Sequence, residues 1–171
     1  SHACAALTNF MEGHTTVLQH EELLTITQKL LALVQNGISL VKENAVTALA
    51  STVEQAKLTF VPFFKEAIGI LIAQMQQYHS KEYKQFRGQV IEAITIICSG
   101  VGETAFAEVA DQVVQAMLEI QTKQLETKDA QRIYLLSAWQ RICLLMKAQF
   151  ATYLPHVLPS IFSMATLNPQ M

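Results

Sequence analysis

The chain has 171 residues, of which 51% are hydrophobic and only 15% are charged, and its formal net charge at pH 7 is −2. Soluble domains usually carry charge on about a quarter of their residues, so this composition is typical of a solenoid segment whose ends lack polar caps. The balanced charge excludes the clustered basic surface that nucleic-acid binding requires. No apolar run approaches the roughly 18 residues of a membrane-spanning helix, so we expect neither a nucleic-acid partner nor membrane insertion.

Apolar residues recur at helical spacing along the whole chain. The turns between the predicted helices are marked by Asn36-Gly37, by Gly100 and Gly102, and by the polar stretch 124–129. No alternating run is bounded by hairpin signals, and no strand is predicted. The predicted helices cover 2–13, 18–36, a segment from Ser39, a segment from Phe60, 82–101, 104–124, 130–148 and 152–165.

One short pattern returns four times, as ACAAL at 3–7, AVTAL at 45–49, VIEAI at 90–94 and AWQRI at 138–142. Each copy is followed by a large apolar residue that opens a second apolar stretch, and these residues are separated by 42, 46 and 47 positions. They are Leu18, Phe60, Phe106 and Tyr153. Because helix-pair repeats of the HEAT or armadillo kind have periods of about 40–47 residues, the pattern predicts an all-α HEAT-repeat α-solenoid.

The repeat pattern divides the chain into about three and a half helix pairs. Proline in the first turn of a helix, where its missing N–H is least harmful, occurs at Pro62 and again 93 residues later at Pro155. Since the chain starts and stops inside this pattern, we expect a fragment of a larger solenoid. Its expected units are 1–14 (partial), 15–57, 58–103, 104–149 and 150–171 (partial).

The sequence contains no assembled set of catalytic or metal-binding residues. Cys4, Cys98 and Cys143 have no metal-ligand spacing, and we predict that all three are buried thiols in a reducing compartment. No Ser–His–acid, Cys–His or paired-carboxylate set can be put together. We therefore predict no catalytic residues, no cofactor and no metal.

Several residues allow two interpretations. The GVGETA segment at 100–105 has the form of a dinucleotide-binding turn, but the residues before it follow helical spacing, which favours a turn between repeat helices. Trp139 is either a core residue or a surface aromatic that clamps a partner's side chain. Phe60, Phe63 and Phe64 are likewise either core residues or exposed docking aromatics.

Five segments in fixed order carry a family resemblance: HACAALTNF at 2–10, FVPFF at 60–64, RGQVIE at 87–92, QT at 121–122 and SAWQRIC at 137–143. Segments 153–155 and 165–169 continue the likeness to the end of the chain. These segments resemble the importin-β (karyopherin-β) nuclear transport receptors, and most of all the importin five subgroup. The likeness extends over essentially the whole chain, which it identifies as a middle portion of such a receptor.

The resemblance implies a right-handed superhelix of HEAT repeats and a non-enzymatic function in nuclear import. Receptors of this kind shuttle between cytoplasm and nucleus, and they bind cargo proteins with basic nuclear-localisation signals on the concave side, which the second helices line. FG-repeat nucleoporins bind the convex side, and Ran-GTP is held largely by repeats outside this fragment. Similar proteins have a strongly acidic loop where this chain has LETKD at 125–129, so a cargo contact there is in doubt.

The polar sides of the predicted second helices then become candidate cargo contacts. Their carboxylates and amides can accept charge-assisted hydrogen bonds from lysine ammonium groups. The repeat alignment places Thr47, Glu92 and Gln140 in one column, and Asn44, Gln89 and Ser137 one turn earlier. The candidates are Glu43, Asn44, Thr47, Glu54, Gln89, Glu92, Tyr134, Ser137 and Gln140, with Ser51 and Gln85 beside them.

Two rival functions remain open from the sequence. A HEAT-repeat scaffold, such as a phosphatase or kinase regulatory subunit, would bind a folded partner and not an extended basic peptide. A dinucleotide-dependent enzyme would use Gly100 and Gly102.

Overall fold

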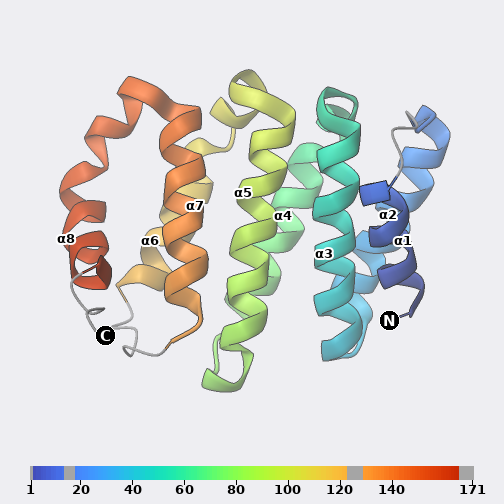
Figure 1. Cartoon of the computed structure of the whole chain (residues 1–171), viewed down its shortest axis with the longest axis horizontal. Coiled ribbons are helices and arrows are strands. Elements are labelled where there is room, and N and C mark those ends of the chain that lie inside the picture. The colour runs from blue at the N-terminus through green and yellow to red at the C-terminus, as the bar shows by residue number, and fades with distance from the viewer. Residues whose placement is uncertain (1, 14–17, 123–128, 166–171) are drawn as a thin grey trace.

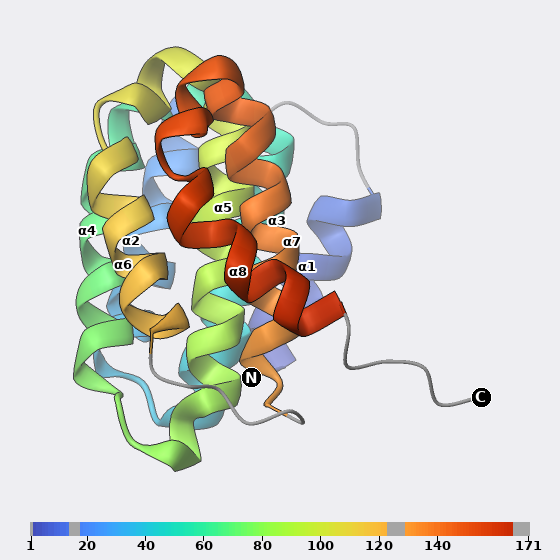
Figure 2. The same ribbon diagram turned by 90° about the vertical axis from the view of Figure 1, so that its left-hand side faces the viewer.

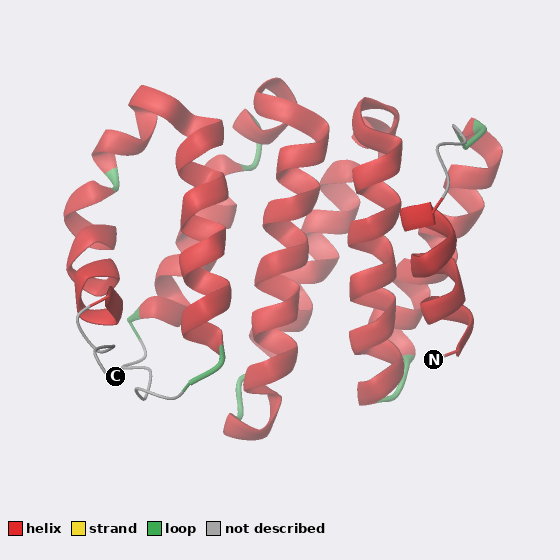
Figure 3. Cartoon of the chain, viewed as in Figure 1, coloured by secondary structure: helices red, strands yellow, loops and turns green. Residues whose placement is uncertain are grey.

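The computed structural model describes residues 2–13, 18–122 and 129–165, and within these ranges every regular element is a helix (Figure 3). Short 3₁₀ segments join some of the α-helices, at Lys57–Phe60, Lys81–Tyr83 and Lys147–Thr152. The all-helical prediction is confirmed. The α-helices are α1 (His2–Gly13), α2 (His20–Asn36), α3 (Ser39–Ala56), α4 (Val61–Gln77), α5 (Lys84–Ala107), α6 (Ala110–Gln121), α7 (Gln131–Met146) and α8 (Leu154–Ala165).

The helices form two layers. Helices α1, α3, α5 and α7 stand side by side in one layer, and α2, α4 and α6 lie behind them (Figures 1 and 2). Each pair consists of a helix from the back layer followed by one from the front layer, and α5 packs against both α3 and α7. The core therefore lies between the layers and continues from one pair to the next, as in a solenoid.

A backbone feature fixes the length of the repeat. Lys57 and Lys147 directly follow α3 and α7, Gly102 interrupts α5, and the three residues have positive φ angles of 49°, 51° and 83°. They are 45 residues apart. Residues at this interval hold equivalent positions, and the second helices α3, α5 and α7 can be aligned on them.

This register corrects the alignment of the third unit. Ser137, and not Gln140, is equivalent to Thr47 and Glu92, while Tyr134 is equivalent to Asn44 and Gln89. The sequence alignment was wrong by one helical turn in α7. Apolar residues recur every turn on the buried side of a helix, so a pattern of apolar residues alone does not distinguish a shift of this size.

The turn at Gly102 also settles the GVGETA segment. Gly102 has φ 83° and ψ 175° and interrupts the helix, whereas Gly100 is helical and packs against α3, where an added Cβ would lie 3.0 Å from a Val53 methyl carbon. The preceding residues are helical, so the strand that a dinucleotide site requires is absent from this described segment. The predicted break between helices at 101 and 104 is confirmed, because Gly102 separates two helical segments within α5. The predicted helix 104–124 is divided, because the second segment of α5 ends at Ala107 and α6 begins at Ala110.

The predicted core aromatics are buried. Phe60 and Phe64 are at most 1% exposed, Phe63 is 9% exposed, and Trp139 is 1% exposed. The core interpretation of these four residues is confirmed, and a surface clamp at Trp139 is excluded. Prolines 62 and 155 both lie in the first turn of their helices, as predicted.

Two segments, Ser39–Gln77 and Lys81–Ala107, are long and apolar enough to pass a length-and-composition test for membrane-spanning helices. Half of each apolar window is buried inside the fold. The first segment is two α-helices joined through Lys57–Phe60, and the second is interrupted at Gly102. Both behave as core helices that pack on their neighbours.

Buried cations join the two layers at a repeated position. Lys42 donates to the Val34 and Gln35 carbonyls at 2.7 and 2.6 Å and to Gln74 Oε1 at 2.7 Å. These carbonyls belong to the last turn of α2, where backbone acceptors lack helical partners. The cation therefore satisfies the end of the first helix from inside the second.

Arg87 occupies the equivalent position 45 residues later. Its Nη1 donates to the carbonyls of Tyr78 and Ser80, both at 2.7 Å, and its Nε donates to Gln131 Oε1 at 2.8 Å. Burial lowers the pKa of the Arg87 guanidinium, and the Asp129 carboxylate opposes that shift. The repetition at Lys42 and Arg87 marks these cations as part of the scaffold.

Candidate cargo-binding face

The nine candidate residues lie on the second helices α3, α5 and α7, and none belongs to the fully buried core. We call the solvent-accessible side of these helices the second-helix face. Thr47, Glu54 and Gln140 are exposed, and the other six are half-buried. Ser51 is only 6% exposed, so its inclusion among the polar surface residues was wrong. Residues 125–128 of the loop discussed above lie outside the described part of the chain.

Several polar groups of α3 bond within their own helix. Asn44 Nδ2 donates to the Leu40 carbonyl at 2.6 Å, and Thr47 Oγ1 donates to the Glu43 carbonyl at 3.2 Å. The Glu43 carboxylate accepts a hydrogen bond from Ser39 Oγ at 3.3 Å. Among the described residues, Glu54 has neither a hydrogen bond nor an ion pair. Within the described residues, the carboxylates of α3 therefore have no cationic partner, and they can accept one from outside.

The amide and tyrosine candidates at the start of α5 and α7 pack against each other. Gln85 Nε2 donates to the Tyr134 hydroxyl at 3.0 Å. The Tyr134 ring covers Gly88, where an added Cβ would lie 2.2 Å from Cδ2 of the ring. Only glycine permits this approach, so Tyr134 holds neighbouring repeats together in addition to facing solvent.

The Oε1 atom of Gln89 is buried and has no hydrogen-bond partner in the described structure. An unpaired buried acceptor is rare in folded proteins. The Gln89 side chain as a whole is half-buried. A rotation of the amide toward solvent would therefore present this acceptor to a donor on the second-helix face.

Glu92 already has a cationic partner. Arg141 of α7 reaches Glu92 Oε1 with Nη2 at 3.8 Å, and its Nη1 lies 3.4 Å from Thr95 Oγ1. The side chains of Arg141 and Glu92 are 30% and 39% exposed. The polar ladder inferred from sequence therefore contains a cation that the sequence pattern did not reveal.

Arg141 also borders a hollow of about 300 Å³ on the second-helix face. The hollow opens between α3, α5 and α7, and its charged groups are Glu54, Lys57 and Arg141. Ile96, Ser99 and Gly100 form the remaining wall. The surface here combines both signs of charge, unlike the uniformly acidic and amide-rich ladder that was expected.

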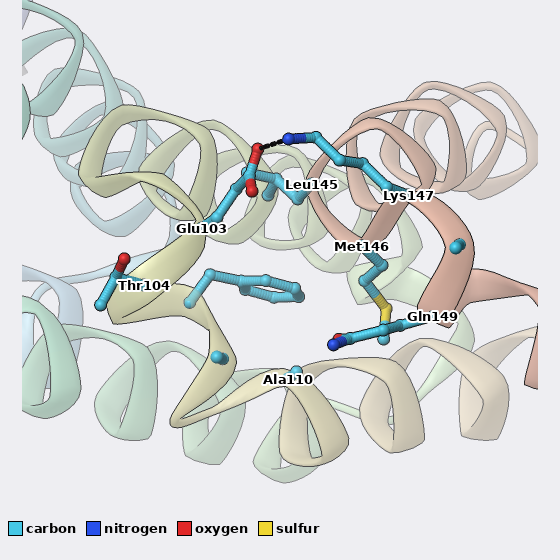
Figure 4. A pocket seen from close by; sticks show the side chains of 10 residues that line it. Glu103, Thr104, Ala110, Leu145, Met146, Lys147 and Gln149 are labelled. Carbon is cyan, nitrogen blue, oxygen red and sulfur yellow. Dashed lines mark ion pairs between the residues drawn. The ribbon is translucent and has the colours of Figure 1, made fainter.

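A larger pocket of about 370 Å³ lies at one end of the same helices, between the turn after α5 and the end of α7 (Figure 4). Glu103 and Lys147 point toward each other across it and form an ion pair of 2.5 Å. Phe106, Ala110 and Met146 contribute to its wall. Both carboxylates of α5, Glu92 and Glu103, are thus paired with cations that follow 49 and 44 residues later in the next repeat.

The exposed side of α7 is partly apolar. Ile133, Leu136 and Leu144 are 74%, 45% and 69% exposed. Cys143 is also exposed, so the prediction of a buried thiol was wrong there, whereas Cys4 and Cys98 are buried as expected. Apolar residues of α7 lie on its exposed side as well as on its buried side. Their periodicity therefore does not identify the buried side, and Cys143 was assigned to it wrongly.

The arrangement of helix pairs defines a segment of a HEAT-repeat solenoid, whose extended second-helix face is suited to binding another protein. No protein-family model matches the chain. The chain is 29% identical over 161 residues to importin subunit beta-3 of Saccharomyces cerevisiae, an alignment that covers 94% of this chain and 15% of that protein. Over 71% of the chain it is 24% identical to the probable importin subunit beta-4 of Schizosaccharomyces pombe.

Solved structures of Kap121p share the fold. The structure of Kap121p bound to Pho4p matches with a TM-score of 0.79 and 28% identity, and the match covers 99% of this chain and 16% of Kap121p. Kap121p bound to Nup53p matches with the same TM-score, and Kap121p bound to RanGTP matches with a TM-score of 0.75. The chain is therefore similar in sequence and in fold to karyopherins of the importin-β family. It spans about 15% of the length of the importin beta-3 that it resembles.

Proposed function

We propose that this chain is a segment of a nuclear transport receptor and that its second-helix face binds cargo proteins through basic nuclear-localisation segments. The match of nearly the whole chain to Kap121p, a karyopherin solved with Pho4p, with Nup53p and with RanGTP, carries the proposal. The carboxylates Glu43 and Glu54, which form no ion pair within the described part of the chain, support the choice of face.

The remaining partners follow from the same relationship. The receptor binds FG-repeat nucleoporins and moves between cytoplasm and nucleus through nuclear pores. Ran-GTP is bound through repeats other than those described here. The relatives are transport receptors and not enzymes, which supports a non-enzymatic function and disfavours both rivals, the regulatory scaffold and the dinucleotide-dependent enzyme.

The test reverses two charges on the second-helix face. In a Glu43→Lys/Glu92→Lys variant, affinity for a lysine-rich peptide should fall at least tenfold, because each charged hydrogen bond contributes about 1.5–3 kcal/mol. Fluorescence anisotropy with a labelled peptide measures this effect. Affinity of the unmodified protein should also fall with added salt, since partly exposed charge pairs are screened.

The chain offers a matched control on the opposite layer. Glu66 of α4 and Glu119 of α6 are exposed, so Glu66→Lys/Glu119→Lys makes the same change in net charge away from the second-helix face. This variant should bind the peptide within about twofold of the unmodified protein, because exposed charges beyond the Debye length of about 8–10 Å are largely screened. Equal loss in both variants, or no loss in a folded Glu43→Lys/Glu92→Lys protein, would contradict the proposed face.

A further inference from the structure

We propose that Arg141 is an internal competitor for the lysine side chains of the cargo. In the free protein it occupies the Glu92 carboxylate, and a cargo lysine must displace it to bind there. This inference rests on the proposed function, and it assigns to Arg141 a selective role on the same face.

The contact geometry fits a displaceable partner. Arg141 Nη2 lies 3.8 Å from Glu92 Oε1, at the long end of an ion pair, and both side chains are partly exposed. Exposed pairs of this kind are worth little because water and salt screen them. A guanidinium at this distance therefore neutralises the carboxylate without holding it tightly.

Arg141 has a place to go when it leaves Glu92. Its Nη1 is also close to Thr95 Oγ1, and its side chain borders the 300 Å³ hollow that Ser99 helps to line. The hollow is open to solvent, so the displaced guanidinium stays hydrated.

Comparison between repeats separates this contact from the scaffold. The buried cations Lys42 and Arg87 recur at equivalent positions, and both donate to backbone carbonyls at or just after the end of the preceding helix. The counterparts of Glu92 and Arg141 one repeat earlier are Thr47 and Ile96, which cannot form an ion pair. The Glu92–Arg141 contact is therefore a local feature of the second-helix face and is not required by the repeat architecture.

Competition of this kind selects for the number of charges in the cargo. An isolated lysine gains the Glu92 carboxylate only by breaking its pair with Arg141, and it then lies near the guanidinium that it displaced. A segment with several lysines also gains Glu43 and Glu54, which form no ion pair among the described residues. Arg141 thus weakens the binding of sparsely charged segments more than that of lysine-rich ones.

The test uses the 171-residue chain and two labelled, unstructured peptides in a Gly/Ser background, one with five lysines and one with a single lysine. Arg141→Gln should bind the single-lysine peptide about fivefold more tightly and the five-lysine peptide about twofold more tightly, as expected when a partly exposed competing charge is removed. In Arg141→Gln/Glu92→Gln the gain should disappear, since the contested carboxylate is gone.

Lys147→Gln is the matched control, because Lys147 follows the same helix and pairs with the other carboxylate of α5, Glu103. It makes the same change in net charge and should alter either affinity less than twofold. Circular dichroism and thermal melting check folding, and Arg141→Met serves as a second neutral variant. The competitor role would be overturned if Arg141→Gln gained no more peptide affinity than Lys147→Gln. It would also be overturned if the gain in affinity persisted in Arg141→Gln/Glu92→Gln.

The outcomes also separate this inference from the proposed function. If Glu92→Gln weakens binding but Arg141→Gln does not strengthen it, only the competitor role fails. If neither the unmodified chain nor Arg141→Gln binds either peptide, both proposals fail. Binding of the five-lysine peptide by the unmodified chain, together with single-lysine binding that appears only in Arg141→Gln, supports both.

Discussion

The indole Nε1 of Trp139 donates a hydrogen bond to Gln121 Oε1 at 2.8 Å, and Gln121 Nε2 donates in turn to the His156 carbonyl at 2.9 Å. One amide therefore joins α6, α7 and α8. The Trp139 ring is 1% exposed and lies 6.1 Å from the Phe150 ring, centroid to centroid. Two of the segments that carry the family resemblance, those containing Gln121 and Trp139, meet at this hydrogen bond.

Replacement of Trp139 tests how much this junction contributes to stability. Trp139→Ala should lower the free energy of unfolding by about 3–5 kcal/mol, because it removes a large buried ring. Trp139→Phe should cost less, about 1–3 kcal/mol, since it retains ring packing but leaves Gln121 Oε1 without its donor. Urea denaturation measures both. A cost below about 1 kcal/mol for Trp139→Ala is inconsistent with a core indole.

Replacement of the buried cation Lys42 should lower the free energy of unfolding by an amount similar to that expected for Trp139. Lys42→Met leaves the Gln74 Oε1 and the carbonyls at the end of α2 without their donor, and unpaired buried acceptors cost about 1–3 kcal/mol each. We expect a loss of about 2–4 kcal/mol, because water can reach some of these groups after the change. Lys29→Met on the exposed side of α2 is the control and should change stability by no more than about 0.5 kcal/mol.

Helix positions and the repeat architecture could be predicted because both depend on local periodicity. Apolar spacing located α1 to α8 within a few residues, and Pro62 and Pro155 marked helix starts correctly. The break at Gly102 was predicted, but the further break between Ala107 and Ala110 was not. Residues 103–107 form a short helical segment after the interruption at Gly102. The turn signals in the sequence do not indicate where this segment ends.

The candidate site was harder to predict because it depends on contacts between helices. Glu92 and Arg141 are 49 residues apart, as are Gln85 and Tyr134, and this separation is one repeat of 45 residues plus about one helical turn. A search for opposite charges at that separation would have found Arg141. The repeat length needed for that search came from the backbone angles and not from the apolar pattern, which misplaced α7 by a turn.

The three thiols should differ in reactivity. Cys143 is exposed, whereas Cys4 and Cys98 are buried, and burial raises the pKa of the Cys98 thiol far above its usual range. Because the thiolate is the reactive form, we expect one fast-reacting thiol per native chain toward a thiol reagent at pH 8, and three after unfolding.

Cys143→Ser identifies the fast thiol, because it should abolish the fast phase and leave the melting temperature nearly unchanged. Cys98→Ser should leave the fast phase intact. Fast reaction of a second thiol in the folded protein would contradict the burial of Cys4 and Cys98.

Lys57 tests the backbone feature that defines the repeat. Its φ of 49° and ψ of −125° lie in a region that side chains disfavour, and such strain costs on the order of 1–3 kcal/mol. Gly102 holds the equivalent position in the next repeat. Glycine at position 57 should relieve this strain, but it also stabilises the unfolded state by about 0.5–1 kcal/mol through added chain entropy. The net effect of Lys57→Gly should be a stabilisation of about 1 kcal/mol, which raises the Tm by about 2–4 °C.

Gln55→Gly is the matched control, because Gln55 is exposed and lies two residues earlier within helical α3. It should destabilise the chain by about 0.5–1 kcal/mol, as glycine does inside a helix. Lys147→Gly should gain less than Lys57→Gly, since it also removes the ion pair with Glu103. Thermal melts followed by circular dichroism compare the three variants. Destabilisation by Lys57→Gly to the same extent as by Gln55→Gly would mean that residue 57 is helical and that the 45-residue register does not rest on a shared backbone turn.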